Sequence, residues 1–353
     1  MSTLALPTVD EEIWRYSRIG ELELDNFKLG KLSTKVDASS AAKQIISSTT
    51  NVVSRTSTDI FEDLNGQHAQ LTAITTAKNQ VVAEPIVITH SLDESGVVAY
   101  SRLVVEANEN SEVTIVERFV SSADAKSLIV PVVDVRAAQS ARVTYVAINE
   151  LGAATWQIGY QQAVGQRDST MQMFTVALGG DYARMRAEVR LEGQGASAQQ
   201  VALYFADENQ MHDFRTLQDH AAPRTHSNLL FKGAVKDTAK SVYTGLIRIR
   251  ENATKSEAFQ TNRNLTLSNG AWAESVPNLE IETNDVKCSH ASTVGPIDEE
   301  QRFYLESRGI QPEIAERLVV LGFFDEVLNR LPALPFIAGL RERVSTKLLG
   351  AKS

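Results

Sequence analysis

Residues 97–149 read VVAYSRLVVEANENSEVTIVERFVSSADAKSLIVPVVDVRAAQSARVTYVAIN, a series of short runs rich in Val, Ile, Thr and Tyr that polar clusters separate. The same texture extends from about Pro85 to about Asp285, without a helical stripe of apolar residues. Short runs of β-branched and aromatic residues are typical of strands, and clusters of Asn, Asp, Ser and Gly are typical of turns. This part of the chain is therefore predicted to consist of many short strands.

An internal repeat runs through these strands. Several residues recur as the same type 30 positions later, namely Val105, Ala107, Val113, Thr114 and Val116, which return as Val135, Ala137, Val143, Thr144 and Val146. A flat sheet of so many strands would curl or split, whereas a coil that adds one rung per repeat buries a continuous apolar row. The repeat favours a parallel β-helix (β-solenoid), and a two-sheet β-sandwich is the alternative.

Composition limits the function classes. The chain has 353 residues, of which 43% are hydrophobic and 22% charged, and a net charge of −9. This acidic balance argues against nucleic acid or an anionic membrane as a partner. The single cysteine excludes an internal disulfide. Because no apolar run approaches the ~20 residues of a membrane span and the N-terminus has no basic leader region, a cytoplasmic location is expected.

Three parts are predicted along the chain: an N-terminal helical or mixed segment (1–84), a β-helix core (85–296) and a C-terminal helical domain (297–353). Residues 9–19 carry acids first and arginines last, so we expect a short helix there. Residues 33–58 are rich in Ser and Thr. They indicate either a mobile connection or short strands at the edge of the main body.

The C-terminal part carries helix signals. Asp298 and Gln301 form a capping box, Gly309 would end that helix, and Pro312 would begin a second one. The second helix is predicted to present an apolar face made of Ile314, Leu318, Leu321 and Leu328, widened by Phe323 and Phe324. That face could cover the open end of the β-body or dock to a partner. A third helix is expected in FIAGLRERVSTKLL, residues 336–349.

Cys288 and His290 are the candidate metal ligands. They lie two residues apart, so in an extended strand they project from the same face. A thiolate beside an imidazole is a soft ligand pair for iron, zinc or copper, but it supplies only half of a site. On the residues alone, a small buried cysteine and a structural histidine are the commoner interpretation.

Other motifs give weaker evidence of a functional site. GAVKDTAKS (233–241) lacks the second glycine of a phosphate-binding loop and has the wrong spacing. Glu280, Glu282 and Asp285 precede the cysteine and could supply oxygen ligands or form a solvated strand face. The remaining histidines, His68, His90, His212, His220 and His226, show no metal-binding spacing and are expected to be structural.

The residues resemble the SufB/SufD family of iron–sulfur cluster assembly proteins. The resemblance rests on FKGAVKDTAKSVYTGLIRI (231–249), TNRNLTLSNGAWAESVPNLEIETNDVKCSH (261–290) and DEEQRFYLESRGI (298–310). The short length and the single cysteine resemble the SufD members more than SufB. One departure is Ala291, where the family commonly has glycine. If that glycine needs a positive φ, alanine would strain the turn.

The resemblance implies a right-handed β-helix with flanking helical segments. It further implies pairing with a SufB-like paralogue through the β-helix ends, and docking of a SufC-like ABC ATPase through the C-terminal helices. Cys288 and His290 would then lie at the interface where a nascent iron–sulfur cluster forms transiently, with no permanently bound cofactor.

Three hypotheses follow. The favoured one is a non-catalytic scaffold whose half-site is completed by the paralogue. In the second, two copies of this chain hold a cluster between their Cys288 and His290 residues. In the third, which the low aromatic content disfavours, Glu280, Glu282 and Asp285 serve a polysaccharide-active β-helix enzyme.

Overall fold

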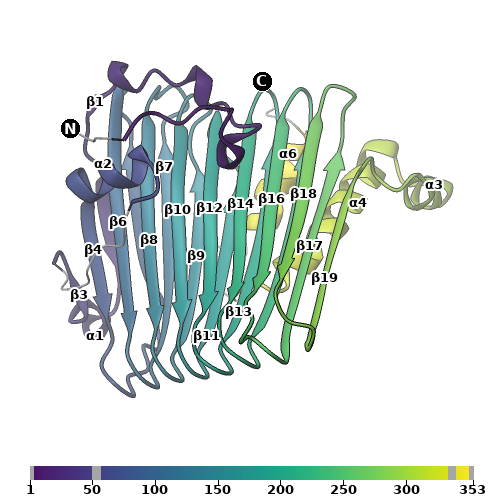
Figure 1. Cartoon of the computed structure of the whole chain (residues 1–353). Coiled ribbons are helices and arrows are strands. Elements are labelled where there is room, and N and C mark those ends of the chain that lie inside the picture. The colour runs from purple at the N-terminus through teal and green to yellow at the C-terminus, as the bar shows by residue number, and fades with distance from the viewer. Residues whose placement is uncertain (1–3, 50–56, 333–338, 350–353) are drawn as a thin grey trace.

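The computed structural model describes residues 4–49, 57–332 and 339–349. Its body consists of two sheets, of 10 and 9 strands, that face each other along the whole molecule (Figure 1). The first sheet contains, in spatial order, β18 (Trp272–Ile281), β16 (Lys240–Ile249), β14 (Met211–His220), β12 (Tyr182–Leu191), β10 (Trp156–Gly165), β8 (Leu128–Ala137), β6 (Val97–Ala107), β4 (Gln70–Thr75) and β3 (Ile46–Ser47), with β1 (Lys28–Leu29) paired to β6. The second contains β19 (Val286–Gly295), β17 (Ser256–Thr266), β15 (His226–Val235), β13 (Ser197–Ala206), β11 (Thr170–Ala177), β9 (Arg142–Glu150), β7 (Glu112–Ser121), β5 (Ile86–Leu92) and β2 (Ser33–Asp37).

The chain coils between the two sheets. From β4 to β19, consecutive strands alternate between them, and each strand pairs in parallel with the next strand of its own sheet. Val105 of β6 lies opposite Val135 of β8, and Thr114 of β7 lies opposite Thr144 of β9. The 30-residue repeat is therefore one turn of a parallel β-solenoid, which confirms the predicted fold. The β-sandwich alternative is wrong, because a sandwich is built from antiparallel neighbours.

A stacked corner allows the chain to turn in each coil. One residue per turn adopts a positive φ, in the series Asn79, Asn110, Ser140, Asp168, Gly195, Arg224 and Lys255. Each of these residues donates its backbone N–H to a carbonyl of the following turn, as Asn110 does to Gln139 at 2.9 Å. Short polar residues and glycine tolerate this left-handed conformation best, which explains the Asn, Asp and Gly in the sequence between strands.

The core is the space between the sheets. Alternate residues of each strand point into it, so successive turns stack like residues such as Val113 on Val143. Each inward valine or isoleucine thus buries its methyl groups against the turns on both sides, which gives the apolar row that the repeat predicted.

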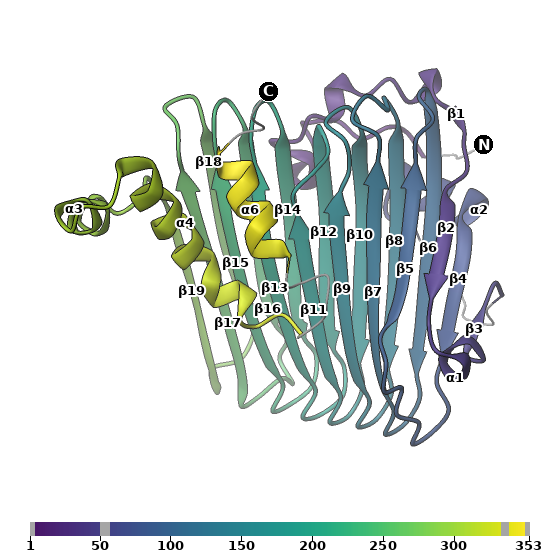
Figure 2. The same cartoon turned by 180° about the vertical axis from the view of Figure 1, so that it is seen from behind.

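The N-terminal end of the coil is covered by short elements. β2 pairs antiparallel with β5, and β3 pairs antiparallel with β4. Helices α1 (Ser40–Lys43) and α2 (Ile60–His68) lie beside them (Figures 1 and 2). Of the two interpretations of residues 33–58, the edge strands are confirmed for the described part; residues 50–56 lie outside it.

The helix expected over residues 9–19 is not formed. The structure has short 3₁₀ turns at Glu12–Trp14 (η1), Ile19–Glu21 (η2) and Leu24–Asn26 (η3), with Tyr16 at φ +67° between the first two. The segment lies across the outer face of the first sheet, where Trp14 and Ile19 are buried. Packing against a flat sheet, rather than helix propensity, decides its path.

In the described part of the chain, three helices follow the last strand. Asp298 caps α3 (Glu299–Ser307) by accepting from the N–H groups of Glu300 and Gln301, and Gly309 follows at φ +86°, as predicted. Pro312 begins α4 (Pro312–Leu328), and α6 (Leu340–Leu349) forms the described part of the third predicted helix. None of the helices in the described residues is long and apolar enough to span a bilayer.

The predicted apolar face of α4 is confirmed in part, because Phe324 is buried and Leu321, Phe323 and Leu328 pack against the same cluster on the second sheet. The helix buries Ala315, Val320, Phe324 and Val327, whereas Ile314 and Leu318 are exposed. It packs against β13 and β15 on the outer face of the second sheet (Figure 2), so it does not cover the open end of the coil. Ile314 and Leu318 are exposed because the sheet contacts the neighbouring stripe, which contains Ala315, Val320 and Phe324. Helix α3 instead projects beyond the body (Figures 1 and 2).

Candidate functional site

Cys288 and His290 lie on β19, the last strand of the coil. β19 pairs only with β17, and its other edge has no strand partner among the described residues. The register places Cys288 beside Ala258 and His290 beside Gln260, and both of those neighbours are buried between the sheets. Residues paired in parallel register share a face. Cys288 and His290 therefore both project toward the interior side, at the end of the coil.

The thiol is half-buried. Cys288 packs against a small apolar cluster formed by Ile247, Ile249, Ala253 and Ala258. Burial raises the pKa of the Cys288 thiol. The neutral thiol is thus favoured over the thiolate. His290, by contrast, is exposed and makes no hydrogen bond among those described.

The rim around this pair is partly apolar. Ser292 of β19 donates to Ser275 of β18 at 2.7 Å, which links the two sheets at their last strands. On the same strands Leu279, Ile281 and Val294 are 39–43% exposed. An apolar rim beside two unpaired strand edges is unusual for a surface that faces only water.

Two of the three upstream carboxylates make contacts away from Cys288 and His290. Glu280 forms an ion pair with Arg248 at 2.8 Å on the outward face of β18. Glu282 accepts from the backbone N–H of Glu251, and the contact recorded for Asp285 is through its backbone carbonyl. No group of three or more His, Cys, Asp or Glu side chains in the described ranges could hold a metal ion.

Ala291 fits its place without strain. It lies within β19, paired with Thr261, and is absent from the residues with positive φ. The condition for strain, a positive φ at this position, is therefore not met, and extended backbone accepts any side chain.

The other buried histidines are structural, as expected. His90 lies between Thr34 at 2.9 Å and Glu117 at 2.9 Å, and Tyr145 donates to the same carboxylate at 2.6 Å. His220 contacts Thr225 and Ser227, both at 2.7 Å. The sequence does not reveal the partners of His90, because they come from different turns of the coil, whereas the partners of His220 lie five and seven residues further along the chain.

Packing explains the glycine in residues 233–241, the segment that does not match a phosphate-binding loop. Gly233 lies in β15, and a Cβ there would be 1.9 Å from Cε2 of Tyr204. The glycine makes room for an interior tyrosine, and the following Lys-Ser pair belongs to the next strand.

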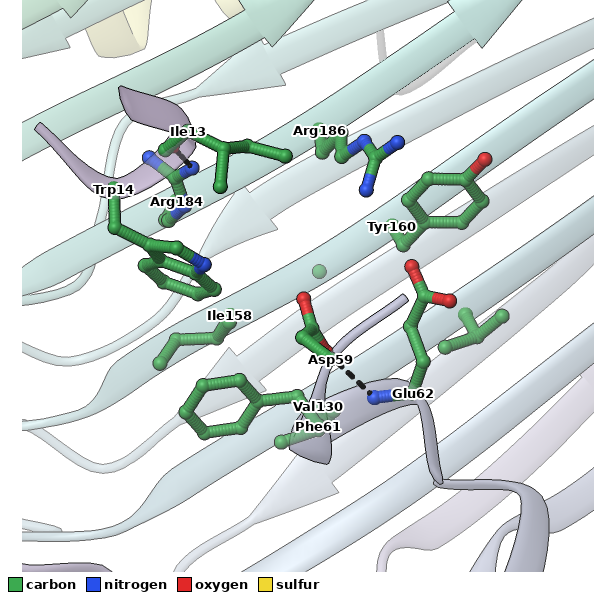
Figure 3. A pocket seen from close by; sticks show the side chains of 12 residues that line it. Ile13, Trp14, Asp59, Phe61, Glu62, Val130, Ile158, Tyr160, Arg184 and Arg186 are labelled. Carbon is green, nitrogen blue, oxygen red and sulfur yellow. Dashed lines mark hydrogen bonds between the residues drawn. The ribbon is translucent and has the colours of Figure 1, made fainter. Parts of the chain in front are cut away.

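A small enclosed pocket lies under α2 and the N-terminal segment (Figure 3). The polar side chains that line it already have hydrogen-bond or ion-pair partners within the protein. Asp59 caps α2 by accepting from Glu62 N–H at 3.0 Å, Arg186 donates to Thr58 at 2.8 Å, and Arg184 pairs with Asp213. The pocket is therefore a seam that attaches these segments to the sheet.

A larger groove lies between α3, α4 and the second sheet. It is lined by Lys232, Arg263, Tyr304, Leu305, Leu318 and Phe323. Phe303 and Tyr304 of α3 are 72% and 58% exposed. This helical surface and the rim at β18 and β19 are two places in the described chain where large apolar side chains are exposed.

Comparison with known proteins gives a consistent result. The family model described as the SufBD core domain of SUF system FeS cluster assembly matches residues 88–323. An iron–sulfur cluster assembly SufBD family protein of Mycobacterium tuberculosis is 40% identical over 285 residues, 78% of this chain and 70% of that protein. The SufD proteins of Escherichia coli and Bacillus subtilis are 29% and 30% identical, covering 82% and 72% of this chain and 69% and 59% of their own.

Proposed function

The chain belongs to the SufBD family of the SUF iron–sulfur cluster assembly system, and we propose that it is a non-catalytic scaffold subunit on which nascent clusters form. It pairs with a SufB-like paralogue through the β18 and β19 end of the solenoid. Cys288 and His290 bind one side of the cluster, the paralogue supplies the remaining ligands, and the finished cluster leaves.

One observation carries this proposal: a thiol and an imidazole share one face of a strand that ends a sheet. Iron–sulfur clusters are usually held by four protein ligands, so two donors from one chain call for a second chain. Unpaired edges of both sheets can add strands from that chain. The exposed Leu279, Ile281 and Val294 would lose their contact with water in the same step.

The second partner is an ABC-type ATPase similar to SufC. We place it on α3 and the groove beside α4, because Phe303 and Tyr304 are exposed there on a helix that projects from the body. A partner's apolar groove could accept such aromatic side chains. ATP hydrolysis would then move these helices and strain the paired end that carries Cys288.

Native mass spectrometry tests the proposal. The purified chain, mixed with a SufB-like and a SufC-like protein, should form one larger complex. Ile281→Asp should prevent pairing with the SufB-like protein, whereas Leu29→Asp, at an exposed leucine on β1 near the other end of the coil, should not. Failure of the unaltered chain to associate with either protein would refute the proposal.

A homodimeric scaffold is the alternative, because the same open end on two copies could form an isologous interface. Anaerobic reconstitution with iron and sulfide separates the two. A self-paired scaffold should show iron–sulfur absorbance without the paralogue and lose it in Cys288→Ala, whereas the favoured scaffold should show little absorbance by itself.

A further inference from the structure

Gln260, on β17, is a buried amide without a hydrogen-bonding partner. The residue is 1% exposed, and neither its carboxamide oxygen nor its carboxamide nitrogen has a partner in the structure. Leaving both groups of a buried amide unpaired costs free energy, and native proteins rarely retain such groups without a reason.

The register shows what can satisfy this amide. Along the inward row of the second sheet, Gln260 lies between Leu229 of β15 and His290 of β19. Leu229 offers no polar atom, so His290 is the polar neighbour of Gln260 along this row. The imidazole makes no hydrogen bond among those described, which leaves its ring nitrogens available.

The opposite wall makes room for the amide. Gly245 of β16 faces it, and a Cβ at that position would lie 2.5 Å from Nε2 of Gln260. The nitrogen end of the carboxamide therefore points across the interior toward the first sheet. The carboxamide oxygen is therefore the end that can turn toward β19.

From this arrangement we propose that Gln260 is a positioning residue for His290: its carboxamide oxygen accepts a hydrogen bond from one ring N–H. The other ring nitrogen then presents its lone pair to the metal side of the site. Metal-binding histidines are commonly oriented by such an acceptor on the second nitrogen. The inference rests on the proposed function, since it gives His290 a reason to be oriented.

A side-chain rotation forms this bond. No hydrogen bond joins the two side chains in the structure, but they leave neighbouring strands at paired positions on one face. Such neighbours are about 4.8 Å apart, a separation that rotation about the glutamine side-chain torsions can bridge.

The experiment is a ¹⁵N–¹H NMR spectrum of the full chain labelled at histidine. A ring N–H of an exposed imidazole exchanges quickly with water and gives no cross-peak, whereas a hydrogen-bonded N–H gives one. We expect a ring N–H cross-peak that His290→Asn removes. Gln260→Leu should abolish the same cross-peak, and Gln260→Met should do so as well if the leucine variant folds poorly.

Gln200→Leu is the matched control. Gln200 is also buried and its carboxamide oxygen also lacks a partner, but Leu229 separates it from Gln260 in the same row. This variant should retain the His290 cross-peak, and Gln260→Leu should unfold at a temperature no lower than the unaltered chain.

Two results would overturn the inference: absence of the cross-peak from the unaltered chain, or its survival in both Gln260 variants. Because the spectrum is taken on this chain alone, it does not depend on whether the partner proteins bind. A negative association experiment and a negative NMR experiment thus refute different statements.

Discussion

The two ends of this solenoid are built differently. At the N-terminal end, β2 and β3 reverse direction and pair antiparallel with β5 and β4, so short strands close the parallel coil. At the C-terminal end, β18 and β19 are full-length strands of 10 residues each whose outer edges are unpaired in the described chain. A solenoid can be sealed by short, irregular strands, so the full-length open edge is a feature to be explained.

Two histidines make the contrast concrete. His90, near the closed end, is 2% exposed and held by Thr34 and Glu117. His290, at the open end, is exposed and stands beside Cys288 and an unpaired amide. The histidine at the closed end has partners on both ring nitrogens, whereas the imidazole at the open end is available to another molecule.

The largest expected effect is at the closed end. Glu117→Ala removes the partner of both His90 and Tyr145 in the interior. Leaving these two buried polar groups without their shared partner costs about 1–3 kcal/mol each, whereas His290→Ala should change stability by less than ~0.5 kcal/mol. Urea unfolding measures both. Equal changes in the free energy of unfolding for the two variants would contradict the difference between the two ends.

The pH dependence of stability should come from enclosed histidines. Burial lowers the pKa of His212 to about 3 and that of His220 to about 4. Below the ordinary histidine pKa of about 6.5, these imidazoles become protonated in the unfolded chain but stay neutral in the folded chain. The free energy of unfolding therefore falls as pH falls. The slope should approach ~1.4 kcal/mol per pH unit for each histidine. Denaturant melts between pH 7 and 5 measure it, and an unchanged slope in His212→Asn would contradict the assignment.

The open end should control association. Ile281→Asp places a charge on the exposed rim of β18 and should weaken binding to the SufB-like partner by about 2 kcal/mol or more, the scale of an interface hot spot. Isothermal titration calorimetry gives the difference from Leu29→Asp. If both variants bind like the unaltered chain, the open end is not the pairing surface.

The smallest effect concerns Cys288. Because burial raises the pKa of its thiol, iodoacetamide should modify the folded chain several-fold more slowly at pH 8 than the urea-unfolded chain. The rate should rise further with pH. Equal rates for the folded and unfolded chains would show that the thiol is not held in the half-buried position beside Ala258.

Sequence reasoning reached much of the fold and part of the site. The match of Val113 with Val143 predicted the register between turns, and Asp298 and Pro312 predicted where helices begin. It placed Ile314 and Leu318 of α4 wrongly, because the sequence of a single helix does not show which of two adjacent apolar stripes meets the sheet. It also missed Gln260, although a polar residue in register with Leu229 on an inward row is a signal that the repeat could have shown.

The sequence by itself determined the coil and the pairing of Cys288 with His290 on one strand face, because both depend on local periodicity. Only the tertiary structure decided that this strand ends a sheet, that Gln260 lies beneath His290, and that the carboxylates of β18 face the other way. Those relations join residues from different turns of the coil. They depend on where the stack stops and how its last turns are packed, which no short stretch of sequence specifies.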